Sequence, residues 1–238
     1  MSYYGIRLPK ILHKTLSVKN KRLIIIGDVH GCFDELLDLL KKVNYDSKND
    51  LPILVGDLTM KGPKSLEVIQ YCTKNNINAV RGNVDENSLA NYEKLSQGNS
   101  ENWENYEWMK QLTKKELEYM YELPYTIYLK EINSIVVHAG LDPKKELIDQ
   151  DPKIIVRMRH IQNGIPTSKP TKGEPWINYY NKQPHVYFGH DARKKLQQTP
   201  YVTGLDTACV YGHRLTACVI NDNQKKLISV NARKTYKQ

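Results

Sequence analysis

The feature that most constrains the fold is an alternation of short apolar runs and helical patterns over the first hundred residues. Leu23–Ile26, Leu51–Val55 and Ile77–Val80 are short, mainly aliphatic runs, which is typical of buried strands. Between the first two runs, residues 33–43 carry apolar side chains at helical spacing. The order strand, helix, strand, helix, strand predicts βαβ units around a parallel sheet.

Each of these three predicted strands is followed by a glycine and a polar side chain that can bind a metal. Gly27-Asp28-Val29-His30-Gly31 follows the first strand, Gly56-Asp57 the second and Gly82-Asn83 the third. Ligands of open α/β sheets collect where the strands end. The sequence therefore predicts a functional site at this edge.

The rest of the chain is predicted to complete one domain. A polar helical segment covers Glu86–Glu122, with a capping box from Thr113 to Glu116 opening its last helix. Residues 125–129 and 132–137 are expected to form a hairpin, and 160–184 a long loop. Further strands are expected over 185–188, 201–203, 209–210, 215–220 and 227–230. We expect a basic N-terminal extension over 1–22, one domain over 23–230 with a helical insertion at 87–122, and a basic tail over 231–238.

Charge and apolar content restrict the partners. The 238 residues include 35 Lys and Arg against 26 Asp and Glu, a net charge of +9, which favours anionic partners. The longest apolar runs fall far short of the ~20 residues of a membrane helix. Four cysteines without a CxxC pair are too few for a disulfide framework. We expect a reduced, cytoplasmic protein that does not bind membranes.

Two later predicted strands add imidazoles to the polar strand ends. His138 follows the strand over 132–137, and His190 follows the strand over 185–188. The metal-ligand candidates, in chain order, are Asp28, His30, Asp57, Asn83, His138 and His190. This mixture suits Mn, Fe, Co or Zn rather than Ca. Six ligands with one bridging carboxylate are about what a centre of two divalent metal ions needs for in-line phosphoryl transfer.

These motifs resemble those of the calcineurin-like metallophosphoesterases, in particular the ApaH-like phosphatases of the phosphoprotein phosphatase superfamily, whose relatives include diadenosine tetraphosphatases and endopolyphosphatases. The resemblance covers about residues 23–220. It is carried by residues 27–31, 54–63, 82–83, 138–140, 188–193 and 203–212. It implies an α/β fold: a calcineurin-like β-sandwich with βαβ units flanked by helices.

The resemblance also implies a role for each candidate. Asp28 and His30 would hold one metal ion, Asn83, His138 and His190 the other, and Asp57 would bridge them. Lys61, Arg81 and Arg159 would hold phosphate oxygens. A metal-bridging hydroxide would attack phosphorus in line while these cations neutralise the charge.

The chain departs from the family pattern at Val84, where the superfamily has a histidine that protonates the leaving group. Valine has no proton to give. The enzyme would then be slow, or use a substrate with a good leaving group such as a phosphoanhydride, or use another acid. His213 is a candidate substitute. Asp85 and Glu86 are weaker ones, since their place suggests a helix N-terminus.

The function that this pattern favours is metal-dependent hydrolysis of phosphoanhydrides, with inorganic polyphosphate as the first choice. Dinucleoside polyphosphates and capped RNA follow, then phosphoprotein serine or threonine. A weakened protein that only binds an anion or a partner is a further alternative. The basic tails give nucleic acid binding only weak support. The sequence does not fix the native metals, the oligomeric state, or endo- against exo-cleavage.

Overall fold

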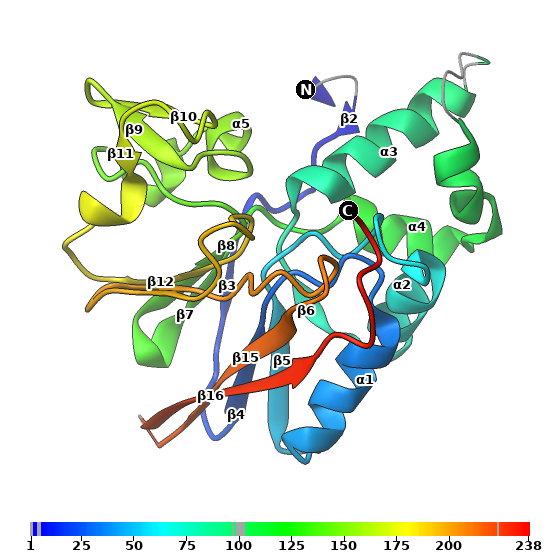
Figure 1. The fold of residues 1–238 in the computed structure, drawn as a ribbon, viewed down its shortest axis with the longest axis horizontal. Coiled ribbons are helices and arrows are strands. Elements are labelled where there is room, and N and C mark those ends of the chain that lie inside the picture. Colours follow the sequence, from blue (N-terminus) through cyan, green and yellow to red (C-terminus); the bar gives the residue numbers. More distant parts are fainter. Residues whose placement is uncertain (1, 4–5, 97, 99–102, 223) are drawn as a thin grey trace.

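Two sheets packed face to face form the centre of the protein. The computed structural model describes residues 2–3, 6–96, 98, 103–222 and 224–238. The first sheet has the strand order β16-β15-β4-β5-β6, and the second has the order β13-β14-β12-β8-β7-β3. Aliphatic side chains from both, such as Ile53 and Val136, are fully buried in one shared cluster. This is the β-sandwich that the sequence motifs implied (Figure 1).

The first sheet contains the predicted βαβ units. β4 (Arg22–Ile26), β5 (Asp50–Leu54) and β6 (Asn78–Ala79) run parallel and are joined by α1 (Phe33–Lys42) and α2 (Ser65–Lys74). β15 (Arg214–Asn221) lies antiparallel to both β4 and β16 (Gln224–Asn231). The three parallel strands end at one edge, as the alternation predicts.

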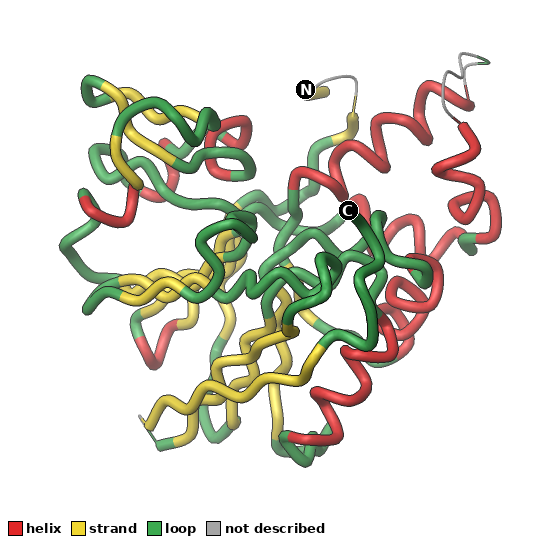
Figure 2. The backbone as a smooth tube through the Cα atoms, viewed as in Figure 1, coloured by secondary structure: helices red, strands yellow, loops and turns green. Residues whose placement is uncertain are grey.

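Helices cover the outer face of this sheet, because its other row of apolar side chains must also leave water. α1 and α2 pack there with α3 (Asn83–Ser96), η1 (Trp103–Gln111) and α4 (Lys114–Tyr121). Thr113 and Glu116 form the expected capping box of α4. Figure 2 shows most of the helices on one side of the strands.

The second sheet contains the predicted hairpin. β7 (Thr126–Leu129) and β8 (Ser134–Val137) are antiparallel and joined by η2 (Lys130–Ile132). β12 (His185–Phe188) lies parallel to β8 and to β14 (Val202–Gly204), and β13 (Gln197–Gln198) is at the edge. η3 (Leu147–Asp149) and α5 (Pro152–Ile155) follow β8 in the chain.

Residues 160–184, expected as a long loop, form a small sheet instead. β9 (His160–Gln162) pairs with β10 (Ile165–Thr167) and β11 (Glu174–Pro175), and η4 (Trp176–Asn178) follows. The hairpin turn is Asn163-Gly164, and both residues have positive φ. This dipeptide is a strong hairpin signal, and its strands are too short to show alternation.

Cys209–Val210, expected as a strand, lies in a turn. Ala208 has φ 62°, and the Gly212 N–H donates to the Cys209 carbonyl. The left-handed backbone at Ala208 reverses the chain, so that residues 209–210 lie in a turn.

Part of the expected N-terminal extension over 1–22 belongs to the sandwich. β3 (His13–Leu16) pairs in parallel with β7, whereas β1 (Ser2–Tyr3) and β2 (Ile6–Arg7) pair only with each other. The mixed polar sequence of β3 fits its place at the edge of the second sheet, because one side of an edge strand remains accessible to solvent.

All four cysteines are buried and free. No helix in the described part of the chain is long and apolar enough to cross a membrane. The cytoplasmic location stays a prediction.

Candidate metal and phosphate site

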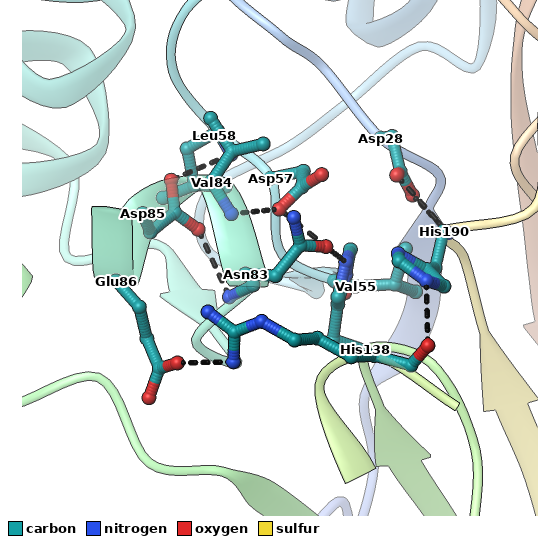
Figure 3. Close-up of polar contacts among 12 residues, drawn as sticks. Asp28, Val55, Asp57, Leu58, Asn83, Val84, Asp85, Glu86, His138 and His190 are labelled. Carbon is teal, nitrogen blue, oxygen red and sulfur yellow. Dashed lines mark hydrogen bonds and ion pairs between the residues drawn. The ribbon is translucent and has the colours of Figure 1, made fainter. Parts of the chain in front are cut away.

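Six of the predicted site residues lie together where five strands end, and Figure 3 shows five of them: Asp28, Asp57, Asn83, His138 and His190. Asp28 and His30 follow β4, Asp57 follows β5, Asn83 begins α3 after β6, His138 follows β8 and His190 follows β12. The first four come from one sheet and the two later histidines from the other. The site is therefore built where the two layers of the sandwich meet.

Asp57 lies at the centre of this group. Its Oδ2 is 3.4 Å from His30 Nε2, and its Oδ1 is 3.3 Å from His138 Nε2. Two ligand sets share it, Asp28/His30/Asp57 and Asp57/His138/His190, and within each set the ligand atoms lie within 4.8 Å of one another. Asp57, to which the resemblance assigned the bridging role, is thus common to two groups of residues that could each hold a metal ion.

Tight backbone geometry makes this convergence possible. His30, Asp57 and His190 have φ of 47°, 49° and 69°, in the left-handed region that non-glycine residues rarely adopt. A Cβ on Gly82 would lie 2.2 Å from Asp57 Oδ1. Only glycine therefore lets the chain after the third parallel strand come this close to Asp57. Such strained residues cluster at functional sites.

The three imidazoles are held in one tautomer each. His30 Nδ1 and His138 Nδ1 lie 3.2 and 2.9 Å from the carbonyls of Thr59 and Val55, and His190 Nε2 lies 3.2 Å from that of Arg157. Because a carbonyl only accepts, each of these ring nitrogens carries the proton. The other nitrogen of each ring keeps a lone pair for a ligand, as is usual in metal sites.

Burial keeps these imidazoles neutral. It lowers the pKa of His138 to about 4 and holds the pKa values of His30 and His190 well below the ordinary value. Neutral imidazole is the form that binds metal.

Buried carboxylates surround the same centre. Burial raises the pKa of Asp57 to about 6, and the pKa of Asp28 rises well above its ordinary value through burial and then repulsion from Asp206 and Asp57. The pKa of Asp206 also rises to about 6, chiefly through burial. Crowded buried carboxylates favour a bound cation, because it removes their mutual repulsion.

The Asn83 amide gives a direct test of whether a cation fits. Its Oδ1 lies 3.1 Å from His138 Nε2 and 2.8 Å from His190 Nδ1, so three acceptors face one another without a proton between them. Rotation of the amide would let its NH₂ group donate to both rings. A divalent cation satisfies all three atoms without that rotation. The donor set therefore fits a metal ion of the borderline class.

A cavity of about 380 Å³ opens over this centre. Lys61 and Arg159, both predicted to bind phosphate, line it, and Lys61 Nζ lies 3.0 Å from His30 Nε2. The Arg159 guanidinium approaches the His190 carbonyl at 3.4 Å. Cations beside a metal-type ligand set are suited to hold phosphate oxygens.

Sequence reasoning missed three charged residues of this cavity: Arg193, Lys195 and Asp206. Arg193 and Asp206 lie in two of the motifs that carry the family resemblance, 188–193 and 203–212, but neither residue was assigned a role from the sequence. Arg193 and Lys195 belong to a basic run, residues 193–195, that begins three residues after the motif histidine His190. That run was the available signal.

Arg81 does not reach the cavity. It is fully buried, and its guanidinium donates to the carbonyls of Met120 and Tyr121 at the end of α4 and lies over the Tyr125 ring. The family resemblance implied that Arg81 would hold phosphate oxygens. The structure turns this long side chain to the helical layer, where unpaired carbonyls at a helix end need donors.

Arg157 lies beside the site. Its NH1 donates to the buried Glu86 carboxylate at 2.8 Å. Glu86 and Asp85 are in the first turn of α3, as expected. Asp85 accepts from the N–H groups of Leu58 and Gly82, and burial raises its pKa to about 7.

Val84 and His213 lie on different walls. The Val84 N–H donates to Asp57 Oδ1 at 2.9 Å, and its side chain lines a second cavity. His213 is exposed and lines the first cavity with Tyr211. The imidazole expected as a substitute acid therefore does open onto the space above the metal ligands.

Comparisons with known proteins agree with this geometry. The family model described as calcineurin-like phosphoesterase matches residues 21–216. The asymmetrical bis(5'-nucleosyl)-tetraphosphatase PrpE of Oceanobacillus iheyensis is 28% identical over 248 residues, covering 90% of this chain and 94% of the relative. The symmetrical bis(5'-nucleosyl)-tetraphosphatase of Coxiella burnetii is 29% identical, covering 87% and 90%.

A solved structure is similar over almost the whole chain. The crystal structure of "a putative diadenosine tetraphosphatase" has a TM-score of 0.83 and 33% sequence identity, covering 93% of this chain and 98% of that one. The fold is thus shared along almost the whole of both chains.

Proposed function

The chain belongs to the calcineurin-like phosphoesterase family, and we propose that it hydrolyses dinucleoside polyphosphates at a phosphoanhydride bond. That it is a metallophosphoesterase, and hence a hydrolase, follows from the family and from its tetraphosphatase relatives. The observation that carries the proposal is one cavity in which a metal-type ligand set faces phosphate-binding cations.

Two divalent ions that share Asp57 are the proposed cofactor, drawn from Mn, Fe, Co and Zn. Asp28 and His30 would complete one ligand set, and Asn83, His138 and His190 the other. When bound, such ions neutralise charge on the phosphoryl group and make water a stronger nucleophile. The Val84 N–H, 2.9 Å from Asp57 Oδ1, would hold the shared carboxylate in place.

The cavity cations would bind the polyphosphate chain. Lys61 and Arg159 lie next to the ligand histidines and would contact the phosphoryl group that is attacked. Arg193 and Lys195 line the same cavity and would hold neighbouring phosphates. Fixed cations stabilise charge that spreads over the equatorial oxygens in phosphoryl transfer.

The leaving group explains how the chain can act without the family's histidine at position 84. The leaving oxygen of a phosphoanhydride is weakly basic and needs little protonation. The valine at position 84 would then lower the turnover of such substrates only a little, and that of alkyl phosphates strongly. His213 would supply a proton to the more basic leaving groups, because its exposed imidazole opens onto the cavity.

Inorganic polyphosphate is the second candidate. The net charge of +9 and the exposed side chain of Arg193 favour a dense polyanion. We rank it after dinucleoside polyphosphates, which reverses the order expected from the sequence, because the relatives are tetraphosphatases of that class by name.

The test is hydrolysis by the purified chain loaded separately with Mn, Co or Zn. The panel is diadenosine tetraphosphate, polyphosphate, capped RNA and a phosphoserine peptide, with products separated by chromatography. We expect the highest kcat/KM on diadenosine tetraphosphate. If kcat/KM is higher on another member of the panel, that member replaces diadenosine tetraphosphate as the proposed substrate. If no metal supports turnover, the proposed hydrolysis is refuted and binding of an anion remains as the function.

A further inference from the structure

A second and larger cavity adjoins the metal and phosphate site. It measures about 840 Å³ and lies between the start of α2, the start of α3, η1 and the C-terminal residues. Lys61 lines both cavities, and Val84, whose N–H holds Asp57, lines the second. A bound molecule can therefore extend from the reacting phosphate past Lys61 into this space.

The second cavity has charged residues at its lining, Lys61, Glu67 and Lys237, but it carries more aromatic side chains than the first. Its aromatic side chains are Tyr106, Trp108 and Tyr236, all half-buried. Exposed amides stand among them, at Asn105 and Gln111. Aromatic faces with amide groups suit a flat base that stacks and forms hydrogen bonds at its edge, whereas a phosphate chain needs cations.

The C-terminal wall of this cavity is fixed in position. The Tyr236 hydroxyl donates to the buried Glu35 carboxylate at 2.7 Å, and its N–H donates to the Val210 carbonyl at 3.0 Å. Its ring is thus held against the main body before any ligand binds, and little rotamer freedom remains to be lost. In Figure 1 the chain after β16 passes α1 and ends near the helical layer.

We propose that this cavity binds one nucleoside of the substrate, with the phosphate chain passing Lys61 into the first cavity. The inference rests on the proposed function and adds to it the place where the base is recognised. Val84 belongs to this recognition surface, because its uncharged side chain forms part of the wall nearest the metal ligands.

The experiment compares two substrates on each protein preparation. Trp108→Ala removes the largest ring of the cavity, and Tyr179→Ala removes an aromatic ring that is 46% exposed and lies outside both cavities. We expect Trp108→Ala to raise the KM for diadenosine tetraphosphate at least about fivefold, the lower end for loss of a stacked base. The KM for tripolyphosphate, which has no base, should not change, and Tyr179→Ala should alter neither.

Because Trp108 also packs against the core, the wild-type chain is tested as well by photolabelling with 8-azido-ATP and peptide mapping. We expect label on residues 103–111 or 234–238. Label confined to 190–214 overturns the inference, as does an equal change of KM for both substrates. If the wild type cleaves tripolyphosphate but not diadenosine tetraphosphate, the proposed function fails and this inference with it. If the wild type cleaves both substrates but Trp108→Ala does not selectively raise the KM for diadenosine tetraphosphate, this inference is refuted and the proposed function stands.

Discussion

The metal-ligand layer and the cations around the cavity are held in different ways. Asp57 and His138 are 2% and 0% exposed and follow buried strands within three residues, so the sheets fix them. The side chains of Arg159 and Arg193 are 23% and 55% exposed and come from loops. Substitution of a candidate metal ligand should therefore abolish hydrolysis. Substitution of one cation should only weaken phosphate binding, and the more buried the cation, the larger the loss.

The largest effect is expected for Asp57→Asn, because a neutral amide cannot offset the charge of two cations. Turnover should fall by at least about 10²–10³-fold, the scale for loss of one preorganised electrostatic group. Metal content, measured by mass spectrometry of the dialysed protein, should fall with it. Asp38→Asn, a surface carboxylate paired with Arg233, is the matched control and should retain both. An Asp57→Asn protein with full metal content and normal turnover would refute the shared-ligand assignment.

A smaller effect is expected for Lys61→Ala and Arg159→Ala. Each removes one charge-assisted contact, worth ~1.5–3 kcal/mol, so the inhibition constant for inorganic phosphate should rise about 10–100-fold. Metal content should stay the same. Arg193→Ala, at the more exposed position, should raise the constant only a few-fold. Equal effects of Arg159→Ala and Arg193→Ala would show that burial does not determine how much each cation contributes to phosphate binding.

Val84→His tests the leaving-group argument. An imidazole at this position should raise turnover of phosphoserine or alkyl phosphates by about tenfold, below the ~10²–10⁴ of an optimised general acid. Phosphoanhydrides should gain little. His213→Ala should reduce turnover only for the poor leaving groups. Equal changes on both substrate classes, with metal content intact, would reject the argument.

The smallest effect on catalysis is expected for Arg81→Ala. Its guanidinium donates to two buried carbonyls away from the cavity, so the variant should lose about 2–4 kcal/mol of unfolding free energy in urea. The phosphate inhibition constant should stay within twofold of the wild type. An increase as large as that of Arg159→Ala would place Arg81 in the phosphate site after all.

Much of the fold could be predicted because its signals are local. The aliphatic runs before Asp28 and Asp57 identify buried strands, and parallel strands must end at a common edge. The Asn163-Gly164 hairpin and the turn at Cys209 were not predicted, since two- or three-residue pairings leave no periodicity to detect. The pairing of β3 with β7 depends on a contact across more than a hundred residues.

The sequence by itself predicted the six candidate metal ligands, because each stands within four residues of the end of a strand, where a side chain has little freedom in where it lies. The tertiary structure alone decided which long cations reach the cavity. Arg81 and Arg159 are alike in sequence terms, yet one guanidinium meets the carbonyls at the end of α4 and the other lies beside His190. A flexible side chain of four rotatable bonds takes its direction from the partners packed around it, and only the folded chain supplies them.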